Sequence, residues 1–328
     1  MGVNSIARYW GKDWIALVLA ATLGIATDAA AQANAPTSLL FKLKQIAPAV
    51  YAAIDGPSGA AGSNAGFIIG DDSVLVVDSF FDPAAATALV AEIRKLTPKP
   101  IRYVVNTHYH VDHVAGDAVM KAAGAVIVAH TNVPSWVRTE NLHLFGDSLS
   151  PQTRSMIETL TLPDVTTDQN LVIWLGKRKI VVRTVTGHTG GDLIVSVPDA
   201  KVVFCGDMLW NHVAPNTIDG NVAGWIGTIN AMTIDVAAAT STFVPGHGDI
   251  ATLNDVLVFQ TYLTDLKTLV ERKRADHLFG DTLVKAAMPE FAGKYHAWDA
   301  FNYFGPLELR HMDEELAGTK RTPLPNHD

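Results

Sequence analysis

Short apolar runs alternate with helix-like patterns along most of the chain. Residues 65–70 and 73–80 are apolar runs separated by a turn at residues 70–72, which predicts a hairpin. "DPAAATALVAEIRKL" then carries apolar residues at helical spacing, with Asp82 as the expected N-cap before a proline. "IRYVV" and "AVIVAH" are typical of strands, and "AGDAVMKAAG" between them of a helix. This half therefore predicts strand, strand, helix, strand, loop, helix, strand.

The second half repeats this alternation with more strands. The runs "NLVIWL", "RKIVVRTV", "DLIVSV", "KVVFCGD" and "TFVPGHG" predict strands, and a helix is expected near residues 221–240. Two such halves facing each other predict an α/β fold, a four-layer αββα sandwich with helices outside. We expect this domain over residues 34–255. Residues 256–328 begin with a strongly helical pattern and are expected to form a helical C-terminal extension packed on or near the domain.

The N-terminus has the pattern of an export signal. Arg8 and Lys12 precede the short apolar run "IALVLAATLGIA", and small residues follow as far as Ala33. The run is shorter than the roughly 20 residues that span a bilayer, although a membrane anchor or a buried helix is the alternative. We expect cleavage of residues 1–33 and a mature chain without a stable membrane span, exported to a bacterial periplasm.

Composition narrows the classes of function. The 328 residues are 48% hydrophobic and 18% charged, which is typical of a compact protein. A formal charge of -8 offers no basic surface, so a nucleic-acid partner is not expected. Cys205 is the single cysteine, which excludes an intrachain disulfide and a cysteine-rich zinc module. A metal site in this chain must therefore use His, Asp and Glu.

The segment "HYHVDH", residues 108–113, crowds ligating groups directly after a predicted strand. His108 and His110 are two apart, so in an extended segment both imidazoles share one face. Asp112 and His113 follow where the chain turns, which favours a second, adjacent position. Three further candidates stand where predicted strands end in turns: His188, Asp207 and His247.

In order and spacing, these residues resemble the metal-dependent hydrolases of the metallo-β-lactamase superfamily, over roughly residues 65–250. The family pattern is HxHxDH, then His, then Asp or Cys, then His. The resemblance implies two Zn²⁺ per chain, with Fe or Mn possible. It also implies that Asp207 bridges the metals and that Asp78 is a structural residue beneath them. The implied ligands are His108, His110 and His188 for the first zinc, and Asp112, His113 and His247 for the second.

The resemblance further implies a zinc-dependent hydrolase. Two divalent ions sharing a water lower its pKa towards roughly 7, and the bridging hydroxide attacks an acyl bond. Asp112 is the candidate catalytic residue, because it can orient the hydroxide or carry a proton in the family manner. The expected substrate is a small lactone, ester, thioester or β-lactam.

Two departures weaken a dedicated β-lactamase assignment. Family β-lactamases with a Cys ligand carry a Lys three positions later, whereas this chain has Asp207 and then Trp210. An Asp ligand is more similar to glyoxalase II-type thioesterases and lactonases. The basic residues of "ERKR", 271–274, resemble the basic helical region of glyoxalase II only faintly, and a solvated helix face explains them as well.

Three alternatives stay open: a dedicated or secondary β-lactamase, a non-haem diiron oxidative enzyme of the same fold, and a non-catalytic metal-binding protein. Tyr109, Trp210 and His212 are candidate substrate contacts, with ordinary packing as the competing explanation. Asp192, in "HTGGD", is a candidate hydrogen-bond acceptor for a ligand imidazole.

Overall fold

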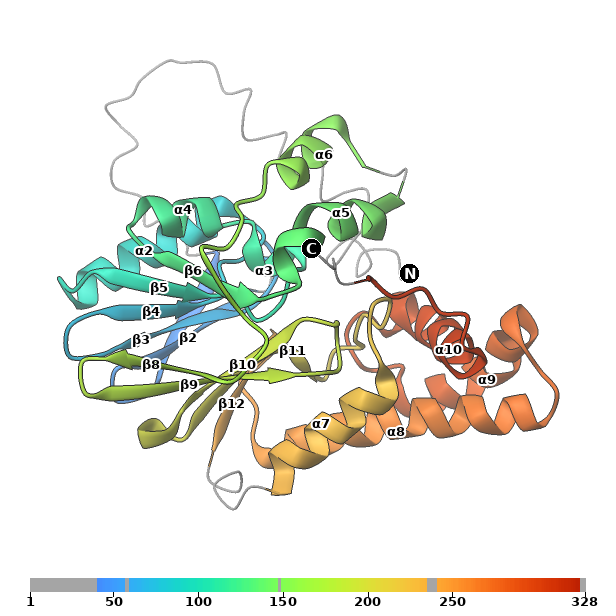
Figure 1. Ribbon diagram of the computed structural model, residues 1–328. Coiled ribbons are helices and arrows are strands. Elements are labelled where there is room, and N and C mark those ends of the chain that lie inside the picture. The colour runs from blue at the N-terminus through green and yellow to red at the C-terminus, as the bar shows by residue number, and fades with distance from the viewer. Residues whose placement is uncertain (1–39, 57–58, 147–148, 235–240, 325–328) are drawn as a thin grey trace, which may run out of the picture.

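The computed structural model describes residues 40–56, 59–146, 149–234 and 241–324 (Figure 1). The predicted export signal, residues 1–33, lies outside the described residues. Among the described helices, none has the length and apolar character needed to cross a membrane.

Two β-sheets lie face to face in the centre of the molecule (Figure 1). The first follows chain order, with β3 and β4 forming the predicted antiparallel hairpin and β4 to β7 parallel. Its strands are β1 (Phe41–Ala47), β2 (Val50–Asp55), β3 (Ala65–Ile69), β4 (Val74–Val77), β5 (Ile101–Val105), β6 (Val126–His130) and β7 (Val165–Thr167). The second sheet comes from the second half, in the order β12 (Thr242–Gly248), β11 (Val202–Asn211), β10 (Asp192–Val197), β9 (Arg178–Val185) and β8 (Leu171–Leu175).

Apolar side chains on both faces of the strands explain this stacking. Along β4, Leu75 lies in the core between the sheets and Val76 in the core beneath the outer helices, because successive strand residues point to opposite faces. The second sheet contributes Ile180 and Val195 to the core between the sheets. The hydrophobic effect therefore holds each sheet on two sides, as the continuous apolar runs of the sequence require.

Helices cover both outer faces and complete the predicted four-layer sandwich (Figure 1). The helix predicted after Asp82 forms, and the Asp82 carboxylate caps it by accepting from the backbone N–H of Ala84 at 2.8 Å. The helices on the first sheet and around its loops are α2 (Pro83–Leu96), α3 (Val111–Val114), α4 (Asp117–Ala122), α5 (Val133–Phe145) and α6 (Pro151–Glu158). The sequence patterns did not anticipate α5 and α6. The second sheet has a 3-10 turn (η3, Pro198–Ala200) before β11 and is covered by α7 (Val222–Ile234) and α8 (Leu253–Ala275).

The predicted C-terminal extension is helical and shares a core with the second sheet. It consists of α8, α9 (Gly280–Tyr295) and α10 (Phe301–Ala317), and α8 crosses the expected boundary at residue 255. Phe259 and Met312 of these helices belong to the same buried cluster as Met208 of β11.

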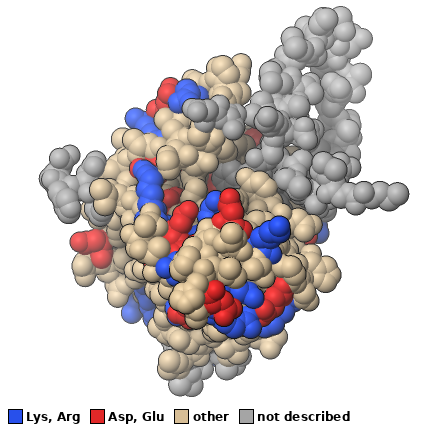
Figure 2. Space-filling model, turned by 90° about the vertical axis from the view of Figure 1, so that its right-hand side faces the viewer, with Lys and Arg blue, Asp and Glu red and all other residues tan. Residues whose placement is uncertain are grey.

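On the outer face of the C-terminal helices, acidic and basic side chains are interspersed (Figure 2). Several of them pair between helices, for example Lys294 with Asp265.

Two ligand candidates lie in strands rather than in the predicted turns. Asp207 is inside β11 and His247 inside β12. The parallel pairing of these strands is irregular and shifts register on both sides of Gly206, which has the left-handed φ of 50°. The prediction of turns was wrong because the backbone bulges at this point and then continues as a strand.

Candidate metal centre

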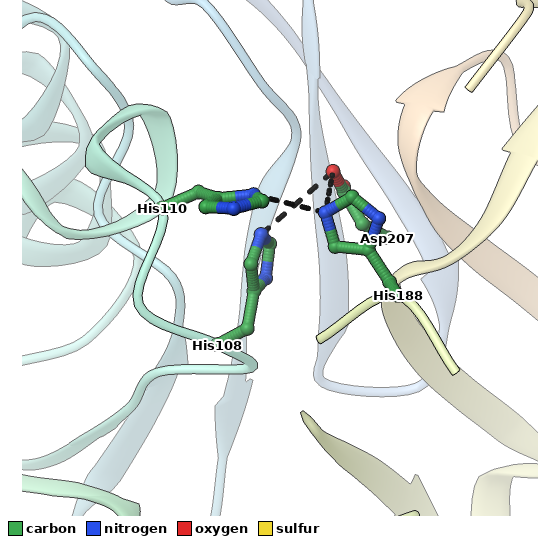
Figure 3. A group of neighbouring side chains, drawn as sticks. All are labelled: His108, His110, His188 and Asp207. Atoms are coloured by element: carbon green, nitrogen blue, oxygen red, sulfur yellow. Dashed lines mark hydrogen bonds and ion pairs between the residues drawn. The ribbon is translucent and has the colours of Figure 1, made fainter. Parts of the chain in front are cut away.

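Four side chains from three segments of the chain meet at one point (Figure 3). This first ligand group consists of His108, His110, His188 and Asp207, and its ligating atoms lie within 4.8 Å of one another. His188 Nε2 is 2.9 Å from His110 Nδ1 and 3.2 Å from Asp207 Oδ2. The four side chains are buried, so their polar atoms converge in a region largely closed to solvent.

The remaining three predicted ligands form a second ligand group: Asp112, His113 and His247. Helix α3 begins directly after His110, so Asp112 and His113 turn away from the first group, as the sequence predicted. Asp112 Oδ2 lies 3.2 Å from His247 Nε2 and 3.4 Å from His113 Nε2. The structure therefore brings all seven predicted ligands into two adjacent groups.

Asp207 lies between the two groups. Its Oδ2 faces His188 of the first group, whereas its Oδ1 is 3.1 Å from His113 Nε2 and 3.5 Å from His247 Nε2. The backbone of Gly246 passes so close that a Cβ there would lie 1.8 Å from Asp207 Oδ1. Glycine at position 246 is therefore necessary for the carboxylate to stand between both groups.

The donor set fits a pair of divalent cations. Among the described residues, the buried ligand atoms without a hydrogen-bond partner include His108 Nε2, His113 Nε2, Asp112 Oδ1 and Asp207 Oδ1. Leaving one such group unsatisfied costs about 1–3 kcal/mol, so several in one place indicate a missing partner. Imidazole nitrogens and carboxylate oxygens are donors that Zn²⁺ accepts.

Burial and charge set the protonation of these imidazoles. Burial holds the pKa of His108 well below its ordinary value and lowers the pKa of His188 to about 3, so both are neutral, as metal ligands must be. At His247, burial acts to lower the pKa, but the carboxylates of Asp207 and Asp112 outweigh it and raise the pKa to about 9. The carboxylates thus favour a positive charge at the second group, and a cation there would replace the proton.

Asp78 supports the second group from beneath, in agreement with its expected structural role. Its Oδ2 accepts from His113 Nδ1 at 2.9 Å, and its two oxygens accept from the backbone N–H and the hydroxyl of Thr107. The proton on Nδ1 leaves the lone pair of His113 Nε2 facing the ligand groups.

Asp219 was not among the residues predicted from the sequence, and Asp192 does not have the partner for which it was a candidate. Asp219 Oδ2 lies 3.3 Å from His110 Nε2 and accepts from the hydroxyl of Tyr109. No motif marks this aspartate. Among the described residues Asp192 bonds no imidazole, and its oxygens instead accept from the backbone N–H of Thr189 at 3.0 and 2.8 Å, within one tight turn.

The three candidate substrate contacts have different surroundings. Tyr109 is fully buried behind His110. Trp210 is also buried, and its ring stacks on that of His247 with centroids 4.0 Å apart. His212 is exposed, and its ring lies against Trp298 rather than in either ligand group. Tyr109 and Trp210 therefore pack against ligands, and the structure does not bring His212 to the centre.

Comparison with known proteins agrees with this geometry. The model of the metallo-beta-lactamase superfamily matches residues 58–247, a range that contains all seven ligand candidates. The chain belongs to the metallo-β-lactamase superfamily. The family assignment and the sandwich fold predicted from the sequence are thereby confirmed.

Individual members of the superfamily are only distantly similar. A hydroxyacylglutathione hydrolase of Brucella anthropi is 27% identical over 152 residues, which are 45% of this chain and 47% of that protein. The matched region thus spans about half of that relative. The mono-zinc form of the metallo-β-lactamase FIM-1 from Pseudomonas aeruginosa superposes with a TM-score of 0.56 at 20% identity, over 70% of this chain and 97% of that one. A double mutant of the sec-alkyl sulfatase PisA1 gives a TM-score of 0.66 at 16% identity, over 85% and 50%. These two likenesses concern the fold.

Proposed function

We propose that this protein is a dinuclear zinc hydrolase that cleaves an acyl bond of a small molecule. The observation that carries the proposal is the position of Asp207, whose two oxygens face two different sets of imidazoles. One carboxylate can then hold one cation on each oxygen. Zinc is favoured because most of the donors are imidazole nitrogens, and a solved relative is described in a zinc form.

In this proposal the first ligand group holds one metal, the second ligand group holds the other, and Asp207 is shared. Bound divalent cations supply a Lewis acid for the acyl oxygen and lower the pKa of a water. Asp112 is the proposed catalytic residue, because its Oδ2 faces His113 and His247 while its buried Oδ1 has no hydrogen-bond partner. That oxygen can orient the attacking water and accept its proton.

Acyl thioesters and simple esters are the substrates that we propose first. The relative from Brucella anthropi is named for a thioester substrate, hydroxyacylglutathione. Trp210, three positions after Asp207, is buried against His247 and offers no cation for the carboxylate of a lactam drug. In the basic stretch 271–274, Arg272 pairs with Glu290 and Arg274 with Asp313, so two of its three cations already have carboxylate partners and we do not propose glutathione itself.

We further propose that the mature protein works in the periplasm after removal of residues 1–33, on the export pattern of the sequence. Mass spectrometry of the protein isolated from fractionated cells tests this directly. Full-length protein retained in the cytoplasmic fraction would contradict it.

A metal analysis and a substrate screen test the main proposal. Protein purified without chelator should contain close to two zinc ions per chain. The metal-loaded protein should hydrolyse thioesters or aryl esters in a panel with lactones, β-lactams and alkyl sulfates. His110→Ala should lose this hydrolysis while keeping its circular dichroism spectrum.

Each alternative has its own signature in these measurements. Turnover of β-lactams alone would identify a dedicated β-lactamase. Iron with a visible absorption band would favour the diiron oxidative enzyme. Two bound metals without turnover of any ester, thioester, lactone or lactam would favour the non-catalytic protein.

A further inference from the structure

The two ring nitrogens of His110 face different partners. Nδ1 lies 2.9 Å from His188 Nε2 inside the first ligand group, whereas Nε2 lies 3.3 Å from Asp219 Oδ2 on the other side of the ring. A carboxylate only accepts hydrogen bonds, so the proton of neutral His110 belongs on Nε2. The lone pair of Nδ1 then faces the first ligand group, as metal ligation requires.

Asp219 is held rigidly in this position. It is buried, and the same Oδ2 accepts a second hydrogen bond from the hydroxyl of Tyr109. The Tyr109 ring lies against the rings of both His110 and Trp136, with centroids 4.7 and 5.7 Å away. Asp219 therefore meets His110 with little rotational freedom.

A buried lysine from the C-terminal segment, residues 318–324, anchors the loop that carries Asp219. Lys320 donates from Nζ to the backbone carbonyls of Thr217, at 2.7 Å, and Gly220, which flank Asp219. Its side chain is only 5% exposed, and the nearest carboxylate, of Glu315, is 3.6 Å away. Because an ammonium is costly to bury without partners, Lys320 holds its loop strongly.

The same segment continues to the other side of Tyr109. Beyond Lys320, the carbonyl of Leu324 accepts from Trp136 Nε1 at 2.8 Å, and Arg321 pairs with Glu140 of α5 at 2.7 Å. The segment thus contacts both the loop of Asp219 and the helix that packs on Tyr109.

We propose that Asp219 is a positioning residue of the first metal site, acting through His110, and that Lys320 of the C-terminal segment holds Asp219 in place. The C-terminal segment would then help to set how tightly one of the two metals binds. The inference rests on the metal centre of the proposed function, but not on the identity of the substrate.

Zinc affinities of four variants test the proposal. Competition with a chromophoric chelator yields two dissociation constants for the wild-type chain. Asp219→Ala should raise one dissociation constant by roughly 10–100-fold and leave the other unchanged. A loss of affinity of this size is typical when the hydrogen-bond acceptor that supports a metal ligand is removed. Asp219→Asn retains an acceptor oxygen and should lose less. Lys320→Met should raise the same dissociation constant by a smaller factor. Lys44→Met, at an exposed lysine, should change neither constant.

A spectroscopic readout separates positioning from general destabilisation. In ¹⁵N-histidine-labelled, zinc-loaded protein, the signal of a His110 Nε2–H should be present in the wild type and altered in Asp219→Ala. Glu308→Gln is the matched control, because Glu308 is a buried acid of α10 that accepts from the hydroxyl of Tyr262 rather than from an imidazole. It should leave both zinc constants unchanged.

The outcomes that overturn the proposal are distinct. Unchanged dissociation constants in Asp219→Ala would reject the positioning role. An equal rise of both dissociation constants together with a lower unfolding temperature would also reject it. Unchanged constants in Lys320→Met alone would reject the contribution of the C-terminal segment. Should Asp219→Ala not fold, Asp219→Asn and Lys320→Met decide the question. A wild-type chain that binds no zinc would instead reject the proposed function.

Discussion

The two ligand groups both consist of imidazoles and carboxylates, but different parts of the molecule support them. In the second group, His113 is oriented by Asp78, which directly follows β4 in the central sheet and is 35 residues away in sequence. In the first group, His110 is oriented by Asp219, 109 residues away, on a loop that Lys320 anchors. Regular elements hold a site more precisely than loops do, and Asp78 adjoins a strand whereas Asp219 lies within a loop. The second group is therefore part of the scaffold, while the first depends on how the C-terminal segment packs.

The largest expected effect is at Asp207, which faces both ligand groups. Asp207→Ala removes the one carboxylate that faces both groups, so we expect loss of tight binding at both metal positions and hydrolysis at the background of metal-free protein. Metal content after dialysis and initial rates on the best ester or thioester check this. Retention of two tightly bound zinc ions would contradict the shared role of Asp207.

Gly246→Ala should also disturb both groups, although it removes no ligand. The new Cβ would lie 1.8 Å from Asp207 Oδ1, so the carboxylate must move away from its position between the groups. We expect both zinc dissociation constants to rise in the chelator competition. Gly227→Ala is a matched control, because a Cβ at Gly227 meets nothing within 4 Å. Equal metal binding by the two glycine variants would show that the close approach is unimportant.

Asp78→Ala should affect mainly the second group and thus sharpen the contrast with Asp219→Ala. His113 loses its orienting acceptor, so we expect roughly 10–100-fold weaker binding in the constant that Asp219→Ala leaves unchanged. Thr107 also loses its buried acceptor, which should lower the free energy of unfolding by about 1–3 kcal/mol. Chelator competition and chemical denaturation measure these two effects. If both variants weaken the same constant, the two supports are not separate.

Glu308→Gln should leave both groups unchanged and alter only the pH dependence of stability. Burial raises the pKa of Glu308 from 4.5 to about 8, although the hydroxyl of Tyr262 partly opposes this shift. Because the folded pKa is the higher one, the contribution of Glu308 to stability is complete below pH 4.5 and is lost as the pH rises to about 8. Between pH 5 and pH 8 the wild type should lose up to ~4 kcal/mol more than the variant. Chemical denaturation at both pH values checks this, and parallel profiles would show that Glu308 ionises normally.

Most of the fold and the ligand set could be predicted because their signals are local. The hairpin of β3 and β4 and the capped helix α2 follow from apolar periodicity and turn residues within a few positions. "HYHVDH" places four ligands in one segment, and α3 turns Asp112 and His113 towards a second position, as expected. His188, Asp207 and His247 could be added because they follow a known family order.

The errors and omissions lie where the direction of a side chain, or a contact distant in sequence, decides its partner. Asp192 has the residue type and position of an imidazole acceptor, but it closes a turn on Thr189. His212 follows a ligand strand closely, yet it lies at the surface beside Trp298. Sequence spacing does not define which way a side chain points once a strand bulges, as β11 does near Gly206.

By itself, the sequence determined the layered α/β architecture and the two neighbouring positions of "HYHVDH", because periodicity and spacing act over short stretches of chain. The family order added His188, Asp207 and His247 and their assignment to the two groups. Only the tertiary structure decided that the backbone of Gly246 packs against the Asp207 carboxylate. It alone also decided that Asp219 approaches His110 and that Lys320 anchors the loop of Asp219. The contacts of Asp219 and Lys320 join segments about one hundred residues apart, and packing, rather than any local pattern, brings such segments together.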